Sequence, residues 1–296
     1  MLLTVYGLDE LAAGVEHVTC LWLLHGRGDT QDSMAFVAGA LLNSLPAQAT
    51  GSTKGVIAVT FDQRNHGSRL VDPKANVSWK QGNPTHGIDM FNIFSGTAMD
   101  VSTLIDHLPS YLPLQYKSYE HVCLGVSLGG HATWQVLLAE PRVRAGVVVI
   151  GCPDYTALMT DRAVRSQLAS TLESKGTRFA GSEDFPPALL KVIAEKDPAG
   201  LLLGDGLSRE EQKKLLNERL GGKKILSLSG GKDKLVPYKQ GERALGWLKE
   251  QSGLEVKDVV DDGAGHELSA HMREVAEKWF AEVVRAGETG GVKSKI

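Results

Sequence analysis

The chain has few cysteines, no long hydrophobic run and no excess of one charge sign. An odd number of cysteines argues against a disulfide framework, and apolar, strand-like segments hold or border all three: Cys20, Cys123 and Cys152. No apolar run approaches the ~18 residues of a membrane span, and residues 1–10 lack the features of a secretory signal. The net charge of −3 gives no electrostatic reason to expect nucleic acid or an anionic membrane as a partner. We therefore expect a cytoplasmic protein that acts on a small molecule, with its oligomeric state left open.

Short, nearly continuous apolar runs alternate with helix-patterned segments along most of the chain. A hydrophobic content of 42% is enough for a full core. Apolar runs of this length are typical of strands buried on both faces of a sheet. The alternation predicts an α/β fold with a mostly parallel central sheet and helices on both faces. The predicted strands are a short one within 1–17, then 17–24, 55–61, 120–126, 145–150, 224–228 and 255–260.

Three segments depart from this alternation. Residues 155–222 predict two or three amphipathic helices and no strand, which we interpret as a helical cap inserted into one α/β core of residues 1–154 and 223–286. Residues 67–93 predict a long loop, with a helix from Ser95 that Pro109 ends. The Gly- and Lys-rich residues 287–296 are expected to form a flexible tail.

One apolar run ends abruptly in Gly-x-Ser-x-Gly, at residues 125–129, and a helix pattern follows at once. Strand, sharp turn and helix in this order form the context of a nucleophile elbow, with Ser127 at its apex. Such a turn strains the backbone, so the positions around the serine must carry almost no side chain, which Gly125 and Gly129 satisfy. The alternative is an ordinary strand-to-helix turn.

Two further reactive residues each follow a predicted strand, Asp233 and His266. Because ligands bind beyond the carboxyl ends of parallel strands, both are expected at the same sheet edge as Ser127. A serine hydroxyl needs a base to take its proton, which would be His266, while an acid fixes the histidine tautomer and stabilises the imidazolium. Asp233 is the predicted acid, and Asp154, which also follows a strand, is the alternative.

The order Ser, Asp, His along the chain resembles that of the α/β-hydrolase superfamily, and the resemblance runs from the His25-Gly26 turn to the last helix. It implies an oxyanion hole made by the backbone N–H groups of Leu128 and Arg27, with Gly28 as an alternative to Arg27. The sequence His-Gly-Arg-Gly departs from the His-Gly-Gly-Gly of one lipase and esterase group. We expect the Arg27 side chain to be exposed to solvent, and contact with an acidic substrate is the alternative.

Another segment, Asp62-Gln63-Arg64-Asn65-His66-Gly67, resembles the Asp-x-Arg-x-x-Gly segment of the superfamily, which braces loops. A metal site is not expected at His86 and Asp89, since no third ligand has suitable spacing, and no phosphate-loop motif predicts a nucleotide. We therefore expect no cofactor. Candidates for the substrate pocket are Gly26, Gly28, His86 and Asp154.

These residues predict a cofactor-independent serine hydrolase that cleaves a carboxylic ester through an acyl-enzyme on Ser127. Thioesterase, peptidase and acyltransferase activities use the same groups and remain open. The serine argues against the superfamily members that use aspartate or cysteine at the elbow. A protein that binds a small ligand without hydrolysing it is the alternative of a different class.

Overall fold

A seven-stranded sheet forms the centre of the computed structural model, which describes residues 1–45, 52–172 and 174–289. The strand order is β1-β3-β2-β4-β5-β6-β7. Strand β1 runs antiparallel to β3, and all other neighbours are parallel, which confirms the predicted sheet. The strands are β1 (Leu3–Tyr6), β2 (His17–Leu24), β3 (Lys54–Phe61), β4 (Ser118–Val126), β5 (Val143–Val149), β6 (Lys224–Gly230) and β7 (Glu255–Asp261).

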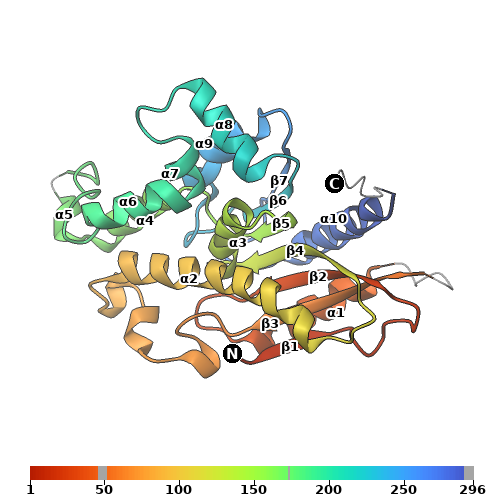
Figure 1. The fold of residues 1–296 in the computed structure, drawn as a ribbon. Helices are drawn as coiled ribbons and strands as arrows, with labels where there is room; N and C mark the ends of the chain where they lie inside the picture. The colour runs from red at the N-terminus through yellow and green to blue at the C-terminus, as the bar shows by residue number, and fades with distance from the viewer. Residues whose placement is uncertain (46–51, 173, 290–296) are drawn as a thin grey trace.

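Helices cover both faces of the sheet (Figure 1). Helices α1 and α10 pack on one face, and α2, α3 and α9 pack on the other. The α-helices are α1 (Ala35–Asn43), α2 (His86–His107), α3 (Leu128–Ala139), α4 (Tyr155–Ser166), α5 (Ala169–Leu172), α6 (Pro187–Lys196), α7 (Pro198–Leu202), α8 (Arg209–Leu220), α9 (Tyr238–Lys249) and α10 (Ala270–Thr289). Short 3₁₀ helices lie at η1 (Gln31–Met34), η2 (Gly67–Arg69), η3 (Pro73–Asn76), η4 (Trp79–Gln81) and η5 (Leu108–Tyr111).

The apolar run of β2 explains why both faces of the sheet are covered. Successive side chains of a strand point to opposite faces. Trp22 and Leu24 enter the cluster beneath α2 and α3, whereas Leu21 and Leu23 enter the cluster beneath α1 and α10. All four side chains are fully buried.

Residues 155–222 form helices α4 to α8, and no strand occurs among those of them that the structure describes. This is more helices than the two or three predicted, because α5 and α7 are too short to give a periodic pattern. Tyr155, Phe179 and Phe185 of this segment belong to the same apolar cluster as α2 and α3. Figure 1 shows these helices beside α2 and α3, beyond one face of the sheet.

Two boundaries differ from the sequence prediction. Helix α2 begins at His86 rather than Ser95, because the turn-like sequence around Pro84 and Gly87 hides the buried residues His86 and Met90, which lie on one helical face. At the other end of the chain, α10 includes residues 287–289 of the expected flexible tail. The rest of that tail, residues 290–296, lies outside the described residues.

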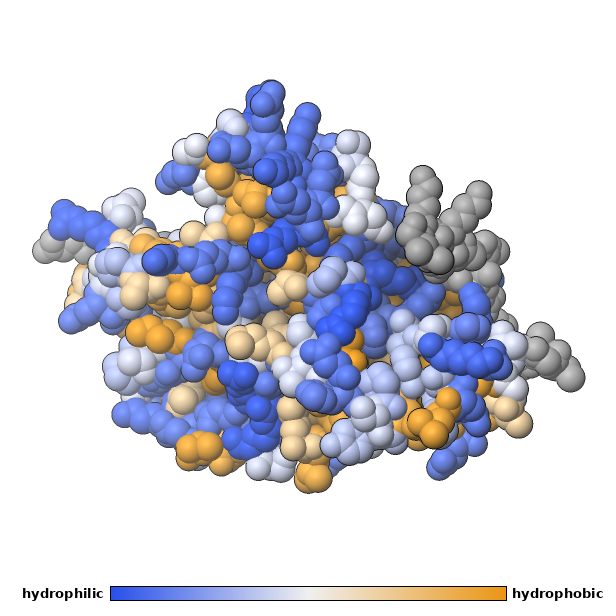
Figure 2. Space-filling model, in the orientation of Figure 1, coloured by the Kyte–Doolittle hydropathy of each residue, from blue (hydrophilic) through white to orange (hydrophobic). Residues whose placement is uncertain are grey.

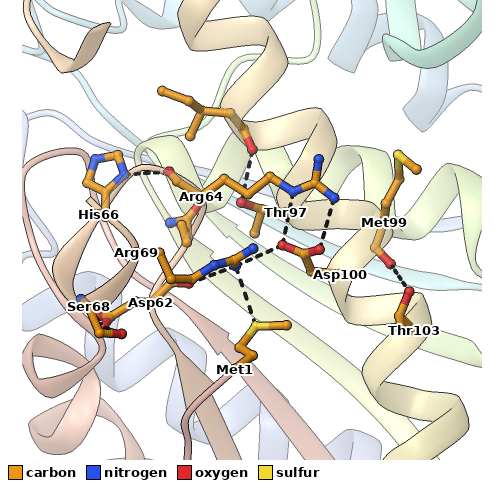
Figure 3. Close-up of polar contacts among 12 residues, drawn as sticks. Met1, Asp62, Arg64, His66, Ser68, Arg69, Thr97, Met99, Asp100 and Thr103 are labelled. Atoms are coloured by element: carbon orange, nitrogen blue, oxygen red, sulfur yellow. Dashed lines mark hydrogen bonds and ion pairs between the residues drawn. The ribbon is translucent and has the colours of Figure 1, made fainter. Parts of the chain in front are cut away.

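The segment after β3 connects that strand to α2 (Figure 3). The Asp62 carboxylate accepts hydrogen bonds from the backbone N–H groups of Gln31 (2.9 Å) and Ser68 (2.7 Å). Arg64 donates to both oxygens of Asp100 on α2, at 3.1 and 3.0 Å. These contacts give Asp62 and Arg64 a loop-bracing role, as the sequence resemblance implied.

Within the described ranges, no helix is both long and apolar enough to cross a membrane. On the face that Figure 2 shows, hydrophilic residues cover most of the surface and apolar residues gather only in small groups. Highly exposed apolar side chains are scattered, as at Val71, Tyr111 and Leu114.

Candidate active site

Ser127 alone makes the turn between β4 and α3. Its backbone has φ 56° and ψ −110°, a conformation that a residue with a side chain rarely adopts. Its N–H donates to the carbonyl oxygen of Val149 on β5 at 2.9 Å, which holds the strained turn against the sheet. The strained turn presents the Ser127 hydroxyl beyond the carboxyl end of β4.

Two glycines make this turn possible. A Cβ atom on Gly125 would lie 2.0 Å from the carbonyl oxygen of Gly129. A Cβ atom on Gly129 would lie 2.1 Å from the carbonyl oxygen of Leu24 on β2. Only glycine therefore lets α3 start this close to the central strands.

The structure brings the three residues predicted from the strand ends together. Ser127 Oγ lies 2.8 Å from His266 Nε2, and His266 Nδ1 lies 2.8 Å from Asp233 Oδ2. The three side chains come from the connections after β4, β7 and β6. Asp233 has a fully buried side chain, while His266 is 23% exposed. The hydroxyl, ring and carboxylate thus form one continuous hydrogen-bonded line.

Asp233 is held as a carboxylate. Its Oδ1 accepts hydrogen bonds from the backbone N–H groups of Leu235 (2.8 Å) and Val236 (2.9 Å). Burial works against the charge, but the hydrogen bond from His266 and these N–H groups outweigh it and hold the pKa of Asp233 below its ordinary value. An ionised Asp233 favours the His266 tautomer that carries its proton on Nδ1, so Nε2 is free to accept a proton from Ser127.

The alternative acid, Asp154, lies elsewhere and does not contact His266. It caps the N-terminus of α4, where its Oδ1 accepts the Ala157 N–H at 2.9 Å. Burial raises the pKa of Asp154 above its ordinary value. Its role in the structure is that of a helix cap.

A pocket of about 100 Å³ opens beside Ser127 and His266. Among the hydrogen bonds of the described residues, none uses the backbone N–H of Leu128, the first residue of α3, or that of Arg27. The first N–H groups of a helix have no intrahelical partner and carry a partial positive charge. The lining residues are Arg27, Met90, Ser127, Leu128, Arg162, Leu235, Val236 and His266.

The other predicted pocket residues do not line this pocket. Gly26 is buried, and a Cβ atom there would lie 3.9 Å from that of Ser127. Gly28 lies on an exposed turn with φ +86°. The buried His86 ring packs edge-on against Trp79, and its Nε2 lies 3.1 Å from Arg162 Nη1. The residues that line the pocket in the described chain do not include Gly26, Gly28, His86 or Asp154.

The Arg27 side chain corrects an expectation. It is half-buried rather than solvent-exposed, its Nη1 is buried without a hydrogen-bond partner among the described residues, and burial lowers its pKa. The turn that holds Arg27 is fixed beneath it by His25, whose Nε2 accepts the Gln63 N–H at 3.0 Å. The guanidinium therefore extends over the pocket and away from bulk water.

Arg162 is a pocket residue that the sequence analysis missed. It is only 6% exposed. A signal was present, because Arg162 follows Leu158 by four residues and Met159 by three, which places it on the buried face of α4. A charged residue on an apolar helix face was read as part of an ordinary amphipathic pattern.

Comparisons with known proteins agree with the fold that carries this site. The sequence model of a family described as "Alpha/beta hydrolase family" matches residues 23–283. YitV of Bacillus subtilis (strain 168), whose name assigns it provisionally to the esterases, is 24% identical over 159 residues. That match covers 53% of this chain and 54% of YitV, so the chain spans about half the length of this curated relative.

Solved structures share the fold. TT1662 from Thermus thermophilus has a TM-score of 0.54 and 18% identity, and the match covers 90% of this chain and 88% of that one. Est1E from Butyrivibrio proteoclasticus, solved with ferulic acid bound, has a TM-score of 0.53 and 13% identity, with 97% and 95% covered. At these identities the likeness establishes the architecture and not the substrate.

Proposed function

Because the chain belongs to the alpha/beta hydrolase family, as its motifs predicted, we propose that it is a serine hydrolase that cleaves a carboxylic ester. The observation that carries the proposal is the hydrogen-bonded line from Ser127 Oγ through His266 to Asp233, with 2.8 Å at each step. The strained backbone of Ser127 adds support, because strain of this kind gathers at reactive sites. The esterase name of YitV favours an ester as the bond cleaved.

In the proposed reaction, Ser127 Oγ attacks the ester carbonyl while His266 Nε2 takes the hydroxyl proton. The negative charge on the carbonyl oxygen is met by the free N–H groups of Leu128 and Arg27, each worth about 3 kcal/mol in reactions of this type. The C–O bond to the alcohol then breaks, and His266 returns the proton to that alcohol.

An acyl ester on Ser127 remains after the alcohol leaves. Water attacks it, His266 takes the water proton and gives it to Ser127 Oγ, and the carboxylic acid is released. Throughout the cycle the buried carboxylate of Asp233 balances the imidazolium charge. All groups that this reaction requires are side chains or backbone amides of the chain itself.

Two further assignments accompany the proposed activity. We assign residues 155–222 to a cap over the pocket, since α4 supplies Arg162 to the pocket wall. A cytoplasmic location is supported by Cys20, Cys123 and Cys152, which are buried free thiols. The partner is a small acyl compound, in keeping with the small pocket.

A panel of activated aryl esters and thioesters with short and long acyl chains tests the proposal. We expect short-chain esters to be hydrolysed, and Ser127→Ala to lower kcat by about 10⁵ or more. Ser110→Ala, on an exposed 3₁₀ helix, is the matched control and should leave kcat unchanged. Preference for thioesters would identify a thioesterase. Activity of Ser127→Ala equal to that of the unaltered protein would leave ligand binding without hydrolysis as the function.

A further inference from the structure

We propose that the substrate is anionic, and that its acyl part ends in a carboxylate held between Arg27 and Arg162 in the pocket beside Ser127. This inference rests on the proposed ester hydrolysis and names the class of ester. Both arginines line the same pocket as Ser127 and His266. They reach it from different elements, Arg27 from the turn after β2 and Arg162 from α4.

Both guanidinium groups lack a negatively charged partner. Neither lies within 4.0 Å of an aspartate or glutamate oxygen among the described residues. Burial lowers the pKa of each, that of Arg162 to about 10, and the positive charge of Arg27 contributes to this decrease. Arginine stays protonated in proteins, so the pocket wall carries two positive charges without an acidic partner among the described residues. A buried charge of this kind is stabilised by an anion.

The hydrogen bonds of Arg162 go only to neutral acceptors. Its Nη1 lies 3.1 Å from His86 Nε2 and 3.3 Å from Met90 Sδ, and its Nη2 donates to the Leu235 carbonyl oxygen at 2.9 Å. Burial, with the Arg162 charge, lowers the pKa of His86 to about 3, so that ring is neutral. These contacts orient Arg162 and brace the loop of Asp233, but they leave its charge uncompensated.

Two donors remain for a ligand. Arg162 Nε and Arg27 Nη1 are both buried without a hydrogen-bond partner among the described residues. Buried donors in proteins are nearly always paired, and these two unpaired donors belong to residues that line one pocket. A carboxylate presents two oxygens with the geometry that guanidinium groups bind best.

Five other arginines of the described chain bind an acidic side chain, and the remaining six do not. Arg64 and Arg69 share Asp100, and Arg142 binds Glu140. Arg165, three residues after Arg162 on the same helix, binds Asp161 at 2.5 Å. Among the described arginines without an acidic partner, Arg162 is the one that is buried.

The exposure of His266 and Arg162 suggests where the substrate carboxylate binds in the pocket. His266, which protonates the leaving alcohol, is partly exposed, so the alcohol departs on the open side. Arg162 is only 6% exposed, so we place the acyl part, which stays bound until water releases it, beside Arg162. The pocket volume of about 100 Å³ is in keeping with a short acyl chain. A half-ester of a small dicarboxylic acid meets these requirements.

The test compares mono-4-nitrophenyl glutarate with methyl 4-nitrophenyl glutarate, in which the second carboxylate is masked. We expect kcat/KM to favour the anionic ester at least tenfold, since hydrogen bonds to charged groups have this strength. Arg27→Gln and Arg162→Gln should each reduce this ratio toward one, and Arg162→Lys should restore part of it. Arg165→Gln is the matched control on the same helix and should keep the ratio. Both esters are measured on the same sample of each variant, so a loss of folded protein lowers both rates equally and leaves the ratio of the two kcat/KM values unchanged.

A ratio near one in the unaltered protein, with the neutral ester hydrolysed through Ser127, would overturn the anionic-substrate proposal and leave the hydrolase proposal standing. Hydrolysis of neither ester would count against the hydrolase proposal. Calorimetric titration of glutarate into Ser127→Ala then shows whether the pocket binds a carboxylate, and it does not depend on turnover. Saturable binding that Arg162→Gln abolishes supports it, and no binding overturns it.

Discussion

At the scale of single residues, the Asp233 carboxylate divides its two oxygens between two tasks. One oxygen accepts from His266 Nδ1, and the other accepts the backbone N–H groups of Leu235 and Val236. The backbone donors fix the carboxylate in place, so its orientation toward the ring does not depend on the ring. This arrangement aims His266 Nε2 at Ser127 before any substrate binds.

Replacing Asp233 with asparagine tests this role. The amide group would donate a hydrogen bond to Nδ1 and favour the wrong tautomer, so kcat should fall by about 10⁴. Steady-state hydrolysis of an activated ester measures the change. Asp154→Asn removes a helix cap and should lower kcat by a few-fold at most. If Asp154→Asn gave the larger loss, Asp154 would be the acid.

The sequence predicted the site residues that directly follow strands. It did not predict the pocket residues whose role depends on the direction in which a side chain points. Ser127, Asp233 and His266 were predicted because each follows an apolar strand, and the structure brings them into contact. The side chain of Arg27 was expected in solvent, but its turn folds it over the pocket. Arg162 was missed because helical periodicity does not show which buried face meets a cavity.

At the scale of elements, the elbow depends on how closely α3 approaches β2. Gly129→Ala would place a methyl group 2.1 Å from the Leu24 carbonyl oxygen, so α3 must shift. We expect unfolding to become easier by about 1–3 kcal/mol, measured by urea denaturation, with activity reduced. Gly39→Ala on α1 is the control, because a Cβ atom there meets nothing within 4 Å. It should be neutral or stabilising by up to about 1 kcal/mol. Equal effects of the two variants would contradict the packing argument.

The turn between α3 and β5 predicts a pH dependence of stability. Burial opposes the Glu140 charge, but hydrogen bonds from Arg142 at 2.7 and 2.8 Å lower the pKa of Glu140 to about 2, from an ordinary value of 4.5. A depressed carboxyl pKa stabilises the fold fully above pH 4.5, and this contribution is lost as the pH falls toward 2.

Glu140→Gln should therefore lower the free energy of unfolding at pH 7 by about 1 kcal/mol, a small value because Arg142 is partly exposed. Urea denaturation at several pH values should show the difference from the unaltered protein shrinking below pH 4.5. A difference that stays constant between pH 7 and pH 3 would assign the effect of Glu140 to packing.

The helices and strands differ in how clearly the sequence pattern predicts their boundaries. Strands such as β2 and β5 were predicted within a few residues, since runs buried on both faces are almost entirely apolar. Helix α2 starts before its predicted position because Gly87 interrupts the pattern, although its carbonyl oxygen accepts the Tyr155 hydroxyl and its neighbour His86 packs against Trp79. Contacts of this kind join segments that are distant in the sequence, so the local pattern of apolar residues does not predict them.

At the scale of the whole molecule, residues 155–222 are packed as part of the core. The ring of Tyr155 lies 5.1 Å from that of Phe91 and 5.3 Å from that of Phe94, both on α2. Its hydroxyl donates to the Gly87 carbonyl oxygen at 2.7 Å. The described residues of the proposed cap therefore share their core with α2 and α3.

This shared core predicts a single cooperative unfolding transition. All tryptophans lie outside residues 155–222, but Trp79 packs edge-on against Phe179 of that segment. In Trp79→Phe, the remaining fluorescence reports on the rest of the chain, from Trp22, Trp134, Trp247 and Trp279. Circular dichroism at helical wavelengths reports on both parts together. The two thermal transitions should coincide, and an earlier loss of helical signal would mean that the cap unfolds independently.

The central claim, that Ser127 is a nucleophile activated by His266, is tested most directly by labelling with a serine-reactive fluorophosphonate. Mass spectrometry of the intact chain and its peptides should find one adduct, on Ser127. The adduct should be absent in Ser127→Ala and should form far more slowly in His266→Ala. An unlabelled protein, an adduct on another serine, or equally fast labelling without His266 would contradict the account.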